Sequence, residues 1–117
     1  METTTAVSAL SALAHAGRLE VFRLLVQAGP EGLAAGEIAR LTGSLANTLS
    51  TNLNILAAAG LAAARRDGRS IIYTAGYDRM GELLAFLVQD CCAGKPEICA
   101  PLMEAASRAC APEGRPC

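Results

Sequence analysis

The 117-residue chain carries a net charge of −1 and is 52% hydrophobic but only 3% aromatic, which fits one domain, or one domain with a tail, built from helices packed through small and aliphatic side chains. The near-neutral charge excludes a general electrostatic attraction to nucleic acid, so any DNA binding must come from a local basic patch. The N-terminus lacks the basic start and apolar run of a secretory signal, and no stretch has membrane-spanning length, so we expect a cytoplasmic protein without a membrane partner.

Apolar side chains at helical spacing predict four helices in the first half of the chain. Gly29 and Pro30 would end the second helix. Gly43 fits the left-handed position at the end of the third, and Ser44 would cap the start of the fourth. The expected ranges are 5–14, 17–28, 34–41 and 46–59.

A β-hairpin and two further helices are expected in the second half. Asp67-Gly68 lies between residues of alternating polarity, which predicts two strands joined at that dipeptide, over 61–66 and 69–75. A broad apolar face predicts a long helix from 78 to 90 or 92, and a short helix is expected near 102–109. The expected fold class is therefore mainly α with a small β-hairpin.

The third and fourth helices, with Gly43 between them, form a predicted helix-turn-helix. Leu49 and Leu53 face inward, so the opposite face of the fourth helix carries short polar side chains that can hydrogen-bond to base edges and phosphates. These are Asn47, Thr48, Ser50, Thr51 and Asn52. The alternative is an ordinary solvated helix face.

The hairpin carries Arg65, Arg66 and Arg69 within five positions. Beside a groove-reading helix, such a hairpin acts as a wing that places arginines on phosphates or in the minor groove. Taken alone it could be a solvent-exposed turn. The order of helix-turn-helix, basic hairpin and apolar helix favours a winged DNA-binding module.

Three cysteines follow the long helix: Cys91 and Cys92, and then Cys99, within CCAGKPEIC. Neighbouring cysteines rarely join each other in a disulfide, whereas three thiols brought together can hold a thiophilic ion. The alternative is that they are small buried hydrophobic residues. Zinc is less favoured because it usually needs a fourth ligand, and Cys110 and Cys117 are interpreted as spare thiols.

The stretches LSALAHAGRLEVFRLL, GEIARLTG and RRDGRSIIYTA resemble the arsenic-repressor (ArsR/SmtB) family over about residues 8–92. The resemblance implies a winged helix-turn-helix that forms a homodimer through its first and last helices. It also implies repression of an operon at an inverted-repeat operator in double-stranded DNA, with release when an inducer binds. The domains would be residues 1–92 for DNA binding and dimerisation and 93–117 for a tail that completes the inducer site.

The chain departs from two of the family's known ligand sites. The third helix, in LAAGEIARL, has no cysteine pair, and His15 is the only histidine for a zinc site. We interpret His15 instead as a hydrogen-bonding residue at a helix end, and Arg18 as a phosphate contact or a solvated charge. The fourth helix has no Lys or Arg, and Asn52 stands where relatives often have histidine.

CCAGKPEIC resembles the arrangement by which some arsenic repressors bind trivalent arsenic, with a vicinal pair and a third cysteine beyond it. The resemblance implies As(III) as inducer, with Cys91, Cys92 and Cys99 as ligands and no permanent cofactor. Antimonite and methylarsenite demand similar thiols, and a two-cysteine site without Cys99 is an open variant. The predicted function is a metalloid-released repressor.

Two other classes of function also use cysteine thiols. A thiol redox switch would join Cys99 to Cys91 or Cys92 on the same DNA-binding module. An enzyme such as an arsenate reductase needs a nucleophilic thiol at a helix N-terminus, and these cysteines follow a helix C-terminus, so we do not expect an enzyme.

Overall fold

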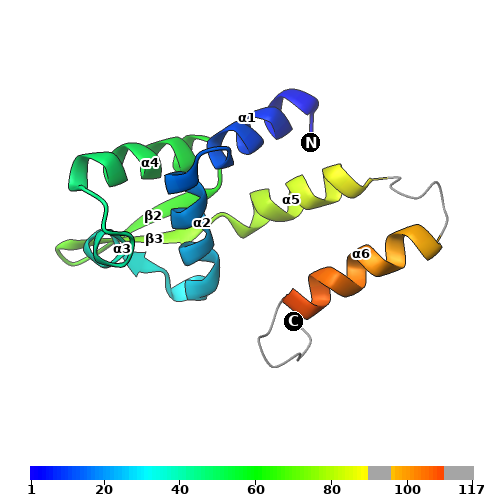
Figure 1. Cartoon of the computed structure of the whole chain (residues 1–117). Helices are drawn as coiled ribbons and strands as arrows, with labels where there is room; N and C mark the ends of the chain where they lie inside the picture. The colour runs from blue at the N-terminus through cyan, green and yellow to red at the C-terminus, as the bar shows by residue number, and fades with distance from the viewer. Residues whose placement is uncertain (90–95, 110–117) are drawn as a thin grey trace. The chain divides into compact units, whose positions relative to one another are not determined.

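The computed structural model describes residues 1–89 and 96–109, and the chain divides into two compact units, Met1–Phe86 and Leu87–Cys117. The expected class, mainly helical with a small antiparallel sheet, is confirmed (Figure 1). The elements in chain order are α1 (Thr3–Leu13), α2 (Ala16–Ala28), the 3-10 turn η1 (Gly29–Glu31), β1 (Leu33–Ala34), α3 (Ala35–Thr42), α4 (Ala46–Ala58), β2 (Ala62–Asp67), β3 (Ser70–Ala75), α5 (Tyr77–Val88) and α6 (Pro96–Ala109).

The three strands form an antiparallel sheet in the order β1-β3-β2. The hairpin of β2 and β3 is as expected, but its loop lies one residue later than Asp67-Gly68. Asp67 pairs with Ser70, so the loop is Gly68-Arg69, and the positive φ of 63° at Gly68 suits glycine at its first position. The two-residue strand β1 was not expected, because so short a strand has no alternation to detect.

The core of the first unit lies where α1, α2, α3 and α4 meet the sheet (Figure 1). Its largest fully buried side chains are Leu25, Ile38, Leu53, Leu56, Leu61 and Val21. Burial of aliphatic side chains of this size contributes about 1.5–3 kcal/mol each before the entropy cost of ordering the chain. Because α4 and the hairpin share this core, their positions relative to each other are fixed.

Gly76 closes the packing between the end of α4 and the end of β3. Its backbone N–H donates to the Leu61 carbonyl at 2.8 Å, and a Cβ at this position would lie 2.0 Å from the Gly60 carbonyl oxygen. Only glycine permits this approach of two backbones. The contact sets where the chain turns from β3 into α5.

The C-terminal helices differ from their expected ranges. α5 ends at Val88 rather than at 90 or 92, and residues 90–95 lie outside the described part. The short helix expected at 102–109 instead begins at Pro96 and continues through Pro101. Proline inside a helix lacks the N–H for one helical hydrogen bond, which is why the sequence favoured a later start. Within the described residues, no helix is long and apolar enough to cross a membrane.

Candidate nucleic-acid interface

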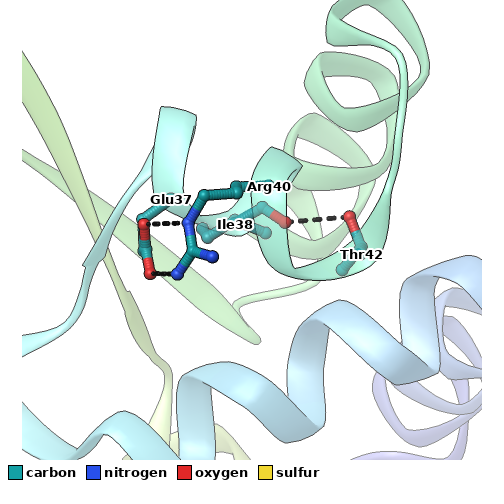
Figure 2. Close-up of polar contacts among 4 residues, drawn as sticks. All are labelled: Glu37, Ile38, Arg40 and Thr42. Carbon is teal, nitrogen blue, oxygen red and sulfur yellow. Dashed lines mark hydrogen bonds and ion pairs between the residues drawn. The ribbon is translucent and has the colours of Figure 1, made fainter.

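The turn between α3 and α4 is held by side-chain hydrogen bonds. Gly43 has φ 68° and ψ 18°, so the expected left-handed position is confirmed. The Thr42 hydroxyl donates to the Ile38 carbonyl at 2.8 Å (Figure 2), and the Ser44 backbone N–H donates to the Thr42 hydroxyl oxygen at 3.3 Å. The turn therefore has a defined shape, which fixes the angle at which α4 leaves α3.

Ser44 does not cap α4, contrary to expectation. Its hydroxyl lies 2.7 Å from the Thr42 hydroxyl, and the Thr42 proton is already donated to Ile38, so Ser44 is the donor in that pair. The residue at the N-cap position is Leu45, whose side chain makes no capping hydrogen bond. The Ser44 hydroxyl, which the sequence pattern predicts as the cap of α4, is thus hydrogen-bonded to Thr42 within the turn.

α4 has one buried and one exposed face, as the leucine spacing predicts. Leu49, Leu53 and Leu56 are 3%, 1% and 0% exposed. The Thr51 hydroxyl donates to the Asn47 carbonyl at 3.0 Å, one turn earlier in the helix. Four of the five predicted DNA-contacting residues on this helix are exposed: Asn47, Thr48, Ser50 and Thr51.

Asn52 is the exception, and the expectation that it shares the exposed face is wrong. It is only 5% exposed and lies against the start of α2, where its Nδ2 is 3.2 Å from the position a Cβ on Gly17 would occupy. Asn52 is three residues after Leu49 and four before Leu56, so the helical period places it on the buried stripe. The spacing of Asn52 from Leu49 and Leu56, unlike its polarity, therefore predicts that it is buried.

The wing arginines divide into two kinds. The Arg65 guanidinium donates to the carbonyls of Pro30 and Glu31, at 3.3 Å and 2.9 Å. Arg66 and Arg69 are exposed, and within the described residues neither has a hydrogen-bond or ion-pair partner. The structure therefore ties Arg65 to η1 and leaves the two other guanidinium groups of the wing exposed to solvent.

A charged pair lies on the exposed side of α3. Arg40 Nε donates to Glu37 Oε2 at 2.9 Å, and a second contact joins Arg40 Nη2 to Glu37 Oε1 (Figure 2). This hydrogen bonding holds the pKa of the Glu37 carboxyl below its usual range and raises the pKa of Arg40. The pair was not predicted, although its i, i+3 spacing is a recognisable signal.

His15 and Arg18 organise the junction of α1 and α2. His15 is the N-cap of α2, and its Nδ1 accepts from the backbone N–H of Gly17 at 3.1 Å and of Arg18 at 3.3 Å, which confirms the predicted helix-end role. Arg18 donates to the Ala12 carbonyl at 2.6 Å and the Ser11 carbonyl at 3.4 Å. Both side chains thus form hydrogen bonds with backbone groups of the same chain.

The predicted thiol ligands are only partly described. Cys91 and Cys92 lie outside the described residues, as do Cys110 and Cys117. Cys99 lies in the first turn of α6, so the expectation that all three cysteines lie at a helix C-terminus is wrong for this one. Its side chain is half-buried and disulfide-bonded. The described residues hold no group of three His, Cys, Asp or Glu side chains placed for a metal ion. The ligand role of the three cysteines stays a prediction.

Known proteins match the segment that carries the interface. Residues 13–64 match a family model described as a helix-turn-helix domain. The helix-turn-helix-type transcriptional regulator YgaV of Escherichia coli is 32% identical over 82 residues, covering 70% of this chain and 81% of YgaV. An uncharacterized helix-turn-helix-type transcriptional regulator of Mycobacterium tuberculosis, Rv0081, is 38% identical over 74 residues, and the match spans 62% of each chain.

A solved structure from another mycobacterium is also similar to this chain. It is a homodimeric winged helix-turn-helix DNA-binding domain from Mycobacterium bovis, from a possible ArsR-family transcriptional regulator, with a TM-score of 0.61 and 31% identity. The similarity covers 73% of this chain and 77% of that one.

Proposed function

The chain belongs to the helix-turn-helix transcriptional regulators of the ArsR-like winged-helix family, and from that premise we propose that it is an operator-specific repressor released by trivalent arsenic. The observation that carries DNA recognition is the exposed polar face of α4 together with two exposed wing arginines that have no partner in the described residues. α4 would enter the major groove and read base edges, while Arg66 and Arg69 would neutralise phosphates.

We propose a homodimer, which the burial pattern of α1 supports. Its inward residues are the small Ala6, Ala9 and Ala12, whereas the larger Val7 and Leu10 are 54% and 41% exposed. When a surface helix packs on its own core through alanine and exposes larger apolar side chains, those side chains indicate a second apolar contact surface. Leu84 on α5 is likewise 54% exposed. A second copy of the chain would cover these side chains and set two α4 helices about one DNA turn apart.

The inducer proposal depends on the thiols of the second unit. Cys91, Cys92 and Cys99 would hold trivalent arsenic, because soft thiolates are the ligands that soft ions prefer. Binding requires the reduced thiolate of each cysteine, so the disulfide of Cys99 must first be opened. The bound ion would weaken DNA binding only by the difference between its affinities for the free and DNA-bound dimer.

The test is operator binding followed by fluorescence anisotropy with reduced protein, titrated separately with arsenite, methylarsenite and zinc. We expect release by a trivalent arsenical and not by zinc. Cys91→Ser and Cys92→Ser should still bind DNA but stay on it when arsenite is added, whereas the matched control Cys117→Ser should respond like the unmodified protein. Release of the Cys91→Ser and Cys92→Ser variants at the original arsenite concentration would contradict the assigned ligands.

A second candidate, redox control of the same repressor, is favoured by the disulfide at Cys99. Hydrogen peroxide would take two electrons and two protons from a pair of thiols, giving the disulfide and water, and the two forms of the dimer would differ in DNA affinity. Release by peroxide, reversal by a dithiol and indifference to arsenite would identify this function. Cys99→Ser would then abolish the response.

A further inference from the structure

Leu45 stands apart from the other apolar side chains of the chain. It is 77% exposed, whereas the other exposed large hydrophobic residues in the described part are 37–54% exposed. It lies at the N-cap of α4, directly after the helix-turn-helix turn and directly before the exposed polar face of that helix. A leucine so exposed gains nothing from the core of its own chain.

Leu45 also weakens the helix that it begins. Its backbone has the extended conformation of an N-cap, with φ −68° and ψ 148°, but its side chain has no oxygen to accept from the first N–H groups of α4. Serine, asparagine and aspartate are the favoured residues here, and leucine is among the poorest. Ser44 does not compensate, because its hydroxyl is bonded to Thr42. Two local rules are therefore broken at one residue, which is typical of a position kept for function.

The position of Leu45 limits what that function is. In helix-turn-helix proteins the N-terminal residues of the second helix contact base edges in the major groove. The leucine side chain can neither donate nor accept a hydrogen bond, and the apolar group that a base pair presents in this groove is the C5-methyl of thymine. From these observations we infer that Leu45 reads the C5-methyl group of a thymine in each half-site. This inference rests on the proposed operator binding.

The surrounding residues support a methyl reader. α4 has no Lys or Arg, so it lacks the side chains that read guanine bidentately. The next residue, Ala46, is exposed and small, which leaves Leu45 room to approach a base edge. Specificity on this helix thus comes from short polar side chains and one apolar contact, and that contact distinguishes thymine from bases without the methyl group.

The experiment replaces thymine by deoxyuridine, which removes the methyl group and leaves the pairing unchanged. An operator is first selected from random duplexes with the unmodified reduced protein, and each of its thymines is then replaced in turn. We expect one position per half-site at which the replacement weakens binding about fourfold, and about 15-fold when both half-sites are changed, from the burial of one methyl group each. Leu45→Ala should bind the thymine and deoxyuridine operators equally.

Two further variants separate a base contact from a change in the fold. Leu45→Ser should supply the missing cap and raise the unfolding midpoint, yet lose the discrimination. Leu41→Ala removes an apolar side chain from α3 that is 45% exposed, and it should discriminate like the unmodified protein. Discrimination that survives in Leu45→Ala, or no thymine position that responds, overturns the inference while leaving operator binding intact. Failure to select any duplex overturns the proposed function itself.

Discussion

The salt dependence of DNA binding separates the two kinds of arginine on the wing. Arg66 and Arg69 are exposed and without partners in the described residues, whereas Arg65 donates to two backbone carbonyls. We therefore predict that Arg66→Gln and Arg69→Gln each remove a phosphate contact and that Arg65→Gln does not. All three substitutions remove the same charge, so net charge alone predicts the same result for each.

The magnitude follows from counterion release. Each neutralised phosphate contributes about 0.9 to the slope of log K against log salt concentration. The proposed homodimer carries each substitution twice, so Arg66→Gln or Arg69→Gln should reduce the slope by about 1.8. Between 50 and 200 mM salt, that difference changes the loss of affinity by about tenfold. Arg65→Gln should keep the slope and weaken binding by the same factor at every salt concentration, because the wing loses its tether to η1.

Fluorescence anisotropy with one labelled operator, at four or more salt concentrations, measures these slopes. Arg108→Gln is a matched control, because Arg108 lies on α6 in an ion pair with Glu104 and has no part in the reading module. A slope for Arg65→Gln that falls as much as that of Arg66→Gln would refute the reasoning, since it would mean that Arg65 leaves the carbonyls and binds phosphate.

Three further predictions concern stability and charge. His15→Ala removes the α2 N-cap and should lower the free energy of unfolding, measured in urea, by about 1 kcal/mol. Gly76→Ala forces a Cβ against the Gly60 carbonyl, so it should cost about 1–3 kcal/mol or prevent folding. The lowered pKa of Glu37 means that its pair with Arg40 stabilises the fold at neutral pH and ceases to do so as pH falls through that pKa; Glu37→Gln should lack this part of the pH dependence.

Each of these predictions has its own control. His15→Asn keeps a side-chain acceptor at the N-cap and should retain most of the stability. Gly36→Ala places a Cβ in open space within α3 and should be neutral or stabilising, in contrast to Gly76→Ala. For the ion pair, Glu37→Gln also removes a negative charge beside Arg40, so DNA affinity should rise. An unchanged affinity would show that α3 does not approach the phosphate backbone.

The leucine period explains why the reading helix could be predicted from sequence and why one of its residues was misplaced. Leu49, Leu53 and Leu56 fix which face of α4 is buried, and the structure keeps that face. Asn52 was assigned by its polarity, although its spacing from Leu49 and Leu56 places it inside. Its burial beside Gly17 depends on how α2 crosses α4, a tertiary contact between residues far apart in the chain.

Local sequence signals could not predict the hydrogen bonds of Ser44 in the turn and of Arg65 in the wing. In each case one polar side chain has more than one possible partner, and the fold decides which one it binds. Ser44 is a good capping residue by type, but Thr42 engages its hydroxyl. Arg65 has the same charge as Arg66, but only the folded chain brings the Pro30 and Glu31 carbonyls within its reach. Sequence patterns identify which groups are available, and the packed structure decides which partner each one takes.

The two wing arginines that have no partner in the described residues bear on how an inducer could act. If Arg66 and Arg69 supply the phosphate contacts, a dimer makes about four, which implies a salt slope near −3.6 and about a 150-fold loss of affinity between 50 and 200 mM salt. Affinity of this kind leaves discrimination to direct contacts from α4. One such contact in each half-site then contributes a large share of the free energy of specific binding, and its loss removes that share. A coupling free energy of about 1–3 kcal/mol, which is typical of allosteric sites, would therefore suffice for release. A thiol site on the second unit need not touch the reading face; it need only favour a dimer in which the two α4 helices no longer match successive turns of the groove.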